Sequence, residues 1–152
     1  MLESILRRVT PLVVKTAESG DRIQAGTTYI APPDFHMLID DGFLKLSHSP
    51  RICFSRPAAD RLFLSAAKHV SSQLIAVVLT GGNADGSDGI TAIKRMGGTV
   101  IAQDRITSDK LRIPRSAIET GNVDYVLPVT EIGPALLTLV LNATERPARV
   151  EQ

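Results

Sequence analysis

The sequence predicts an α/β domain with a mainly parallel, doubly wound sheet and helices on both of its faces. Strand-like and helix-like segments alternate from residue 58 onward, which is typical of parallel sheets built from crossover units. Leu74–Leu79 is a continuous apolar run, as expected of a parallel strand covered on both faces. Earlier in the chain, Asp41-Gly42 separates two apolar runs, which is a strong hairpin signal. An antiparallel hairpin is therefore expected near residues 36–47.

Turn-forming residues mark the elements before residue 50. Pro11 ends a short N-terminal helix, Gly20 and Gly26 bound a turn region, and Pro32 stops the strand that follows. We expect this part of the chain to be antiparallel. The expected elements are a helix over 2–8 and strands over 12–15, 27–30, 36–39 and 43–46.

Helix caps and helical spacing place the later elements. Pro57 suits the first turn of a helix whose apolar residues recur at helical spacing up to Val70. Gly97-Gly98 ends the helix that starts at Gly86, and Thr130 is expected to cap the last helix. The remaining expected elements are strands over 74–79, 100–102 and 125–127 and helices over 86–96, 114–120 and 130–142. Residues 1–144 then form one domain, and the charged segment 145–152 is expected to be a flexible tail.

Composition and charge exclude several classes of function. Seventeen basic against sixteen acidic side chains leave a formal net charge of +1, which disfavours nucleic acid as a partner. The longest apolar runs fall far short of the roughly 20 residues that cross a bilayer, and MLESILRRVT lacks the features of a signal peptide. Cys53 is the single cysteine, which excludes an internal disulfide and a CxxC metal site. We expect a cytoplasmic protein without membrane insertion, metal or cofactor.

The segment Leu79–Gly89 is the most informative part of the sequence for chemistry. It follows a buried strand and opens a helix, the position at which doubly wound sheets collect ligands and catalytic groups. Its glycines, among them Gly81, Gly82 and Gly86, permit tight turns and close backbone approach. Asp85 is expected at the exit of the strand, where it can accept a hydrogen bond from a neighbouring group.

Residues alone leave four interpretations of this loop open. A phosphate cradle has helix amides but neither glycine fingerprint nor a lysine. A calcium loop would use Asn83, Asp85 and Asp88, yet the twelve-residue pattern fails. The third interpretation is a glycine-rich turn with aspartate caps. The fourth is a catalytic site in which Asp85 orients a histidine base, as in a Ser-His-Asp arrangement.

The wider pattern resembles the catalytic domain of the chemotaxis protein-glutamate methylesterases (CheB-type). The matching stretches run in a fixed order over roughly residues 12 to 140. They are Gly20-Asp21, Gly26, Tyr29-Ile30-Ala31-Pro32, His36-Met37, Arg56-Pro57, Asp60, Phe63, Ser65-Ala66-Ala67, Leu79-Thr80-Gly81, Asp85-Gly86, Gly89, Gly97-Gly98, Gln103-Asp104, Pro114, Ala117-Ile118 and Gly121. The resemblance implies hydrolysis of glutamate methyl esters on chemoreceptors, with Asp85 as the catalytic aspartate of a serine-histidine-aspartate site.

The family's other two catalytic residues have no counterpart here. Its serine lies in a Gly-x-Ser-x-Gly-Gly-like turn and its histidine follows a later strand, and both precede the matched region. No Gly-x-Ser-x-Gly occurs in this chain. His36, His48 and His69 are expected to be structural or exposed, and Ser65 is expected to pack rather than react.

Three substituted positions in the matched motifs also bear on the site. The resemblance implies a methionine amide that helps bind the oxyanion; Gly82 and Asn83 stand where the family has Met-Gly. The backbone amide of Gly82 survives but is less preorganised. Ala58 replaces the family's usual serine after Arg56-Pro57.

These departures predict a weak or inactive esterase when the chain is alone. Loss of a triad member typically lowers turnover by about 10⁴-fold or more. By the resemblance, the partners are the cytoplasmic domain of a chemoreceptor and a missing N-terminal segment or receiver domain. The family's N-terminal strands are expected to be missing, which leaves an exposed sheet edge and predicts a homo-oligomer. The alternatives are a non-catalytic binding module that keeps the receptor-facing surface and a small-ligand binder at the 80–89 loop.

Overall fold

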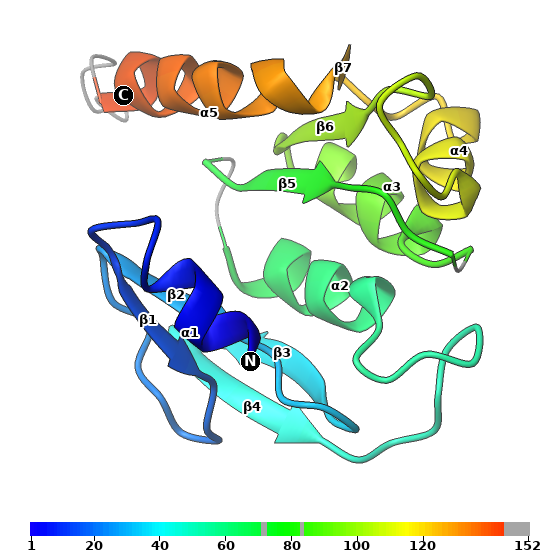
Figure 1. Ribbon diagram of the computed structural model, residues 1–152. Coiled ribbons are helices and arrows are strands. Elements are labelled where there is room, and N and C mark those ends of the chain that lie inside the picture. Colours follow the sequence, from blue (N-terminus) through cyan, green and yellow to red (C-terminus); the bar gives the residue numbers. More distant parts are fainter. Residues whose placement is uncertain (71–72, 83, 145–152) are drawn as a thin grey trace, which may run out of the picture.

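The computed structural model describes residues 1–70, 73–82 and 84–144 and shows the predicted mixture of helices and mostly parallel strands (Figure 1). Asn83, which was considered as a calcium ligand and as part of the oxyanion loop, and the predicted tail over 145–152 lie outside these residues. The elements, in chain order, are α1 (Leu2–Leu6), β1 (Val13–Thr16), β2 (Thr27–Ile30), β3 (His36–Asp40), β4 (Phe43–Ser47), α2 (Ala59–His69), β5 (Ile75–Val78), α3 (Ser87–Arg95), β6 (Thr99–Gln103), α4 (Arg112–Glu119), β7 (Tyr125–Leu127) and α5 (Val129–Thr144).

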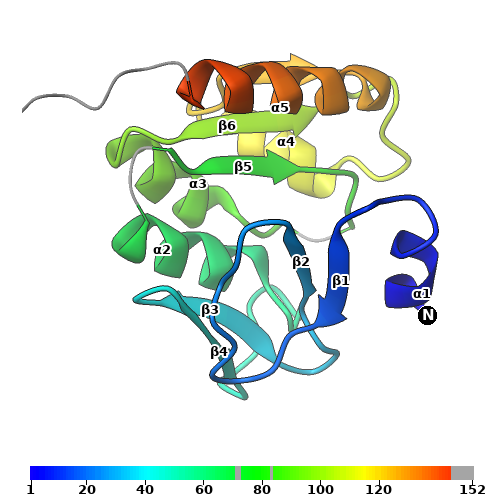
Figure 2. The same ribbon diagram turned by 90° about the vertical axis from the view of Figure 1, so that its left-hand side faces the viewer.

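The C-terminal half is built on a parallel sheet with the strand order β5-β6-β7. Its registers pair Ile75 with Thr99 and Ile101 with Tyr125. Figure 2 shows α5 on one face of this sheet and α3 on the other. Ala76 and Val78 of β5 are buried, whereas Ile75 and Val77 are half-buried, so one face of β5 is less well covered than its continuous apolar run predicts.

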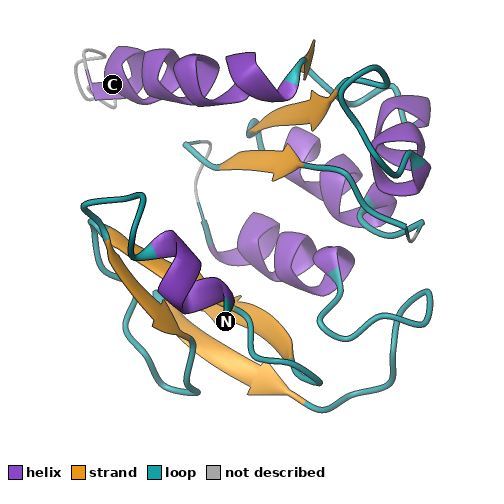
Figure 3. Cartoon of the chain, in the orientation of Figure 1, coloured by secondary structure: helices purple, strands orange, loops and turns teal. Residues whose placement is uncertain are grey.

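Four short strands form the N-terminal half (Figure 3). β3 and β4 make the predicted hairpin, with Asp40 opposite Phe43. β1 and β2, however, pair in parallel, with Val13 opposite Thr27, so the antiparallel prediction is wrong for this pair. The reason is long-range: residues 17–26 carry the chain back to the start of β1, and this connection itself hydrogen-bonds to β4 through Gly20, Asp21 and Leu44.

Helix α2 joins two hydrophobic cores. Ala67 belongs to the larger core, which also contains Ile90 and Ile93 of α3 and residues of β5 and β6. Leu62 packs instead against the smaller core of Ala17, Met37 and Leu44. In Figure 1, α2 accordingly lies between the hairpin and α3. The relative position of the two halves therefore depends on how α2 is held.

The observed helix ends show which local sequence signals predict a helix boundary correctly. Gly97 has a φ of +81°, and the amides of Gly97 and Gly98 bond the carbonyls of Lys94 and Ile93, which confirms the predicted end of α3. Pro57 lies two residues before α2, because Ala58 is still extended (φ −123°, ψ 138°). Thr130 lies inside the first turn of α5 rather than at its cap.

We predict that Gly89→Ala destabilises the protein by about 1–3 kcal/mol, because overpacking a contact between helices costs this much. An added Cβ would overlap the Cβ of Phe63 on α2 and lie 3.2 Å from Oδ1 of Asp60. Denaturant unfolding measures the effect. Gly133→Ala is the matched control, since it lies in α5 with nothing within 4 Å of the added methyl group, and should be neutral or stabilising. Equal effects of the two variants would contradict the close approach of α2 and α3.

Candidate active site

Loop 79–86 leaves the carboxyl end of β5 and enters α3, as the sequence predicts. Gly81 is held on both sides: its N–H donates to the carbonyl of Lys110 (3.1 Å), and its carbonyl accepts the N–H of Ile113 (3.3 Å). A Cβ at Gly81 would overlap the end of the Ile113 side chain, which would have to move to make room for it. Gly82 is exposed, and its N–H has no hydrogen-bond partner among the residues described.

The carboxylate of Asp85 lies against the N-terminus of α2. Its two oxygens accept the backbone N–H groups of Ala59 (2.5 Å) and Asp60 (3.0 Å), and the residue is 4% exposed. The first amides of a helix lack partners within the helix and carry partial positive charge, so they stabilise a carboxylate there. Asp85 thus supplies the cap that Ala58, at the N-cap position, cannot make with its methyl side chain.

Asp60 makes the reverse connection. Its Oδ1 accepts the N–H of Gly89 in the first turn of α3 at 2.7 Å, and the residue is 9% exposed. Asp85 and Asp60 therefore cross-link α2 and the start of α3 in both directions. In the sequence, Asp60 stands out only as part of a matching motif. An aspartate in the first turn of a predicted helix was the available signal, but its partner lies 29 residues away.

A buried glutamine holds the other end of the loop. Gln103, at the end of β6, is 3% exposed; its Oε1 accepts the N–H of Thr80 (2.9 Å) and its Nε2 donates to the carbonyl of Thr107 (2.7 Å). The hydroxyl of Thr80 donates to the carbonyl of Lys110 and accepts the N–H of Lys110. The sequence analysis did not assign a role to Gln103, although a polar side chain at the carboxyl end of a parallel strand is a recognisable signal.

Gly86 completes the predicted set. It has a φ of +105°, lies at the N-cap of α3, and its carbonyl accepts the N–H of Ile90. The structure therefore brings Gly81, Gly82, Asp85 and Gly86 together in one loop, while Asn83 lies outside the described residues. The role of the Gly82 amide as an oxyanion donor stays a prediction.

The three histidines bond other groups than Asp85. His36 is fully buried: its Nδ1 accepts the N–H of Ala58 (3.2 Å), so its Nε2 carries the proton and faces the carbonyl of Pro50 (3.0 Å). His48 bonds Asp34, and His69 lies 3.8 Å from a carboxylate oxygen of Asp40. Ser65 bridges the N–H of Ile39 and the carbonyl of Leu62. These contacts fit structural roles.

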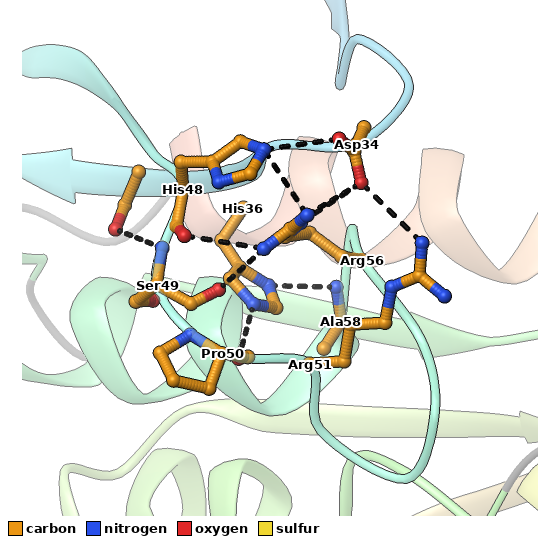
Figure 4. Close-up of polar contacts among 9 residues, drawn as sticks. Asp34, His36, His48, Ser49, Pro50, Arg51, Arg56 and Ala58 are labelled. Atoms are coloured by element: carbon orange, nitrogen blue, oxygen red, sulfur yellow. Dashed lines mark hydrogen bonds and ion pairs between the residues drawn. The ribbon is translucent and has the colours of Figure 1, made fainter.

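A polar cluster lies around Asp34 (Figure 4). The guanidinium of Arg56 donates to Oδ1 of Asp34 from Nε (3.1 Å) and Nη2 (2.7 Å), and His48 lies 3.0 Å from the other oxygen. Arg56, and after it His48, lower the pKa of Asp34 to about 2. Arg56 also donates to the carbonyls of His48 and Ser49, so it ties the segment after β4 to the segment before β3.

None of the helices in the part of the chain that is described combines the length and the apolar character needed to cross a membrane. Within the same residues, no group of three or more His, Cys, Asp or Glu side chains is placed to hold a metal ion.

We predict that Asp85→Ala destabilises the protein by about 2–4 kcal/mol, because it leaves two buried amides unpaired and removes an anion from a helix N-terminus. Asp85→Asn should cost less, since its amide oxygen can still accept one of the two bonds. Urea titration followed by circular dichroism measures both. Asp88→Ala, which replaces an exposed aspartate in the first turn of α3, is the control and should change stability by less than about 1 kcal/mol. If Asp85→Ala lowers the free energy of unfolding by no more than Asp88→Ala does, the capping role is refuted.

We predict that the Asp34 cluster weakens in acid. The folded pKa of about 2 is below the ordinary value of 3.8. The stabilisation is therefore present above about pH 4 and is lost as the pH falls toward 2. The Asp34→Asn variant should be less stable than the unmodified protein at neutral pH, and the difference in stability should shrink as the pH falls to 2. Asparagine tolerates the left-handed backbone of Asp34 (φ +66°), so strain does not obscure the comparison. A stability difference that does not change across this range would contradict the assignment.

Comparisons with known proteins agree with the resemblance. Residues 1–136 match the family model described as CheB methylesterase. A protein of Leptospira interrogans, provisionally named protein-glutamate methylesterase/protein-glutamine glutaminase, is 40% identical over 143 residues, which are 93% of this chain and 74% of that protein. A protein-glutamate methylesterase/protein-glutamine glutaminase of Pyrococcus horikoshii is 42% identical over 131 residues, which are 84% of this chain but only 36% of the relative.

A solved structure confirms the fold. The crystal structure of the Thermotoga maritima CheB methylesterase catalytic domain superposes with a TM-score of 0.85 at 41% identity. The match covers 91% of this chain and 75% of that domain. The family match, the identity to named relatives and this superposition lead to one conclusion: the chain belongs to the CheB methylesterase family.

Proposed function

We propose that this chain provides the aspartate-bearing part of a protein-glutamate methylesterase site that acts on the cytoplasmic domain of chemoreceptors. The observation that carries the proposal is the buried carboxylate of Asp85, fixed at the carboxyl end of β5 in a chain of this family. In a Ser-His-Asp site the serine attacks the ester carbonyl, the histidine takes the serine proton, and the aspartate holds the histidine in position. Each oxygen of Asp85 accepts one amide and keeps capacity for an imidazole N–H.

The serine and the histidine are proposed to come from a segment outside these 152 residues. The chain has no Gly-x-Ser-x-Gly turn, and the described bonds of its histidines go to other groups. The 75% coverage of the Thermotoga maritima domain supports a further segment of the fold. Gly82, an exposed residue three positions before Asp85 in the same loop, is the proposed oxyanion donor.

The edge of β5 is the proposed docking place for this segment. In the described sheet β5 pairs with β6 alone, and the strand Ile75–Val78 has no charge or proline that would prevent pairing with a further strand. Without that segment the same edge is expected to pair with a second copy of the chain. The pocket lined by Ala31, Met37, Pro57, Ala58, Ala59 and Leu62 contains no residue of the 80–89 loop, so it does not favour the small-ligand alternative.

We predict that mixing this chain with the serine- and histidine-bearing segment of a related enzyme restores hydrolysis. The measurement is methanol release from a peptide that contains glutamate methyl ester, with size-exclusion chromatography of each part and of the mixture. Asp85→Asn should still enter the complex but lower turnover by about 10⁴-fold, as loss of the orienting aspartate does in serine proteases. Asp88→Asn should leave turnover unchanged.

The separate outcomes identify which part of the proposal fails. A complex without methanol release would leave a binding module rather than an esterase. A mixture that forms no complex, together with a chain that stays monomeric at high concentration, would refute docking at the β5 edge.

A further inference from the structure

Two neighbouring segments, the one before β3 and the loop between β4 and α2, carry exposed aromatic and cationic side chains. We call Phe35, His48, Arg51 and Phe54 the Phe54 rim. Phe54 is 95% exposed and Phe35 is 37% exposed, while the side chains of Arg51 and His48 are 63% and 59% exposed. The rings of Phe35 and His48 meet edge to face at 5.4 Å. Exposed aromatic rings beside arginine are the side chains that dominate protein recognition sites.

The rim is attached to the candidate active site. The Sγ of Cys53, next to Phe54 in the chain, donates to the carbonyl of Ala84 at 2.9 Å. Ala84 directly precedes Asp85. Figure 1 shows the loop between β4 and α2 and the loop between β5 and α3 reaching the same side of the molecule. A segment bound on the rim therefore lies beside loop 79–86.

The loop that carries Phe54 is held in a defined shape. The backbones of Ile52 and Ser55 bond each other in both directions (3.0 and 2.8 Å), and Arg56, whose side chain is only 11% exposed, fastens the base of the loop to Asp34. Cys53 and Phe54 both have positive φ values, +46° and +65°. A glycine would adopt this conformation without strain, whereas a phenylalanine at 95% exposure gains no packing that would offset it.

The charge of the surface favours an anionic partner. Arg51 and Arg56 carry two positive charges, and Asp34, which contacts both, carries one negative charge. The cluster is therefore positive by one unit before any protonation of His48 (Figure 4). A substrate protein with glutamate side chains near the cleaved ester is anionic, and every hydrolysis adds a further carboxylate to it.

We propose that the Phe54 rim is the surface that binds the glutamate-rich segment of the substrate protein, with Phe54 as the apolar anchor and Arg51 as the cation that selects carboxylates. This rests on the proposed function, because the methylesterase reaction defines the substrate as a glutamate-bearing protein. Binding on the rim places the ester beside Gly82 and Asp85.

A unique fluorophore tests binding without requiring turnover. The chain has no tryptophan, so Phe54→Trp places a single indole on the rim. A short synthetic peptide with four glutamates and two leucines should shift its emission to the blue, because the ring loses water. The matched peptide with glutamines in place of glutamates should bind at least about tenfold more weakly, and salt should weaken the glutamate peptide. Equal affinities for the two peptides, or no change in emission, would overturn the proposal.

Variants of the unlabelled chain assign the contacts, with a fluorescently tagged glutamate peptide as the probe. Phe54→Gly and Arg51→Glu should each weaken binding by about tenfold or more. Leu137→Ala, an exposed apolar residue on α5, and Lys45→Glu, which gives the same net charge as Arg51→Glu, are the matched controls and should bind normally. Phe54→Gly should also raise the midpoint of thermal unfolding, because glycine suits a φ of +65°. Weaker binding by a more stable variant cannot come from unfolding, and normal binding by Phe54→Gly would refute the anchor.

The two proposals fail independently. If the rim binds the glutamate peptide but the reconstituted mixture releases no methanol, the binding surface stands and the esterase assignment falls. If the mixture hydrolyses the ester and Phe54→Gly leaves its KM unchanged, the rim proposal falls and the esterase assignment stands.

Discussion

The contact between the Asp85 carboxylate and the first amides of α2 is the interaction on which the arrangement of this protein depends. Helix α2 belongs to both hydrophobic cores, so whatever orients its N-terminus orients the two halves of the chain. Ala58 offers no side-chain cap, and a carboxylate from a distant loop takes that role. Asp60 of α2 in turn accepts the N–H of Gly89 in α3. The starts of the two helices therefore hold each other in place. Three charge-assisted bonds from two buried carboxylates give a stiffer junction than apolar packing alone, because they are directional.

This cap is compatible with a catalytic role, and it explains how such a role would be prepared. An aspartate that orients a histidine is effective only when its own position is set before the substrate arrives. Backbone amides at a helix N-terminus do this without a mobile side chain. Asp85 is therefore a capping residue in the described fold and a positioning residue in the proposed site. The glycine-turn and catalytic interpretations of loop 79–89 are not exclusive, since the capping bonds that support the first also supply the rigidity required by the second.

The parts of the fold that sequence could predict are those determined by neighbouring residues. Asp41-Gly42 specifies the hairpin, Gly97-Gly98 specifies the end of α3, and the apolar run of β5 specifies a parallel strand. The failures are of another kind. The parallel pairing of β1 with β2 depends on where a ten-residue connection returns, and the roles of Asp60 and Gln103 depend on partners more than 20 residues away. Nothing local distinguishes an aspartate that caps its own helix from one that binds the next helix.

The N-terminus of α2 also connects the active-site loop to the proposed binding surface. Three successive backbone N–H groups at this helix end donate to two side chains. The N–H of Ala58 donates to His36, and those of Ala59 and Asp60 donate to Asp85. The other ring nitrogen of His36 faces the carbonyl of Pro50, at the start of the loop that carries Phe54. Because the tautomer of His36 is fixed by the amide of Ala58, its second nitrogen is a donor and holds that loop to the same helix end. The proposed substrate anchor, Phe54, and the proposed catalytic carboxylate, Asp85, are thus positioned by the same helix end, so a shift of α2 would move both together.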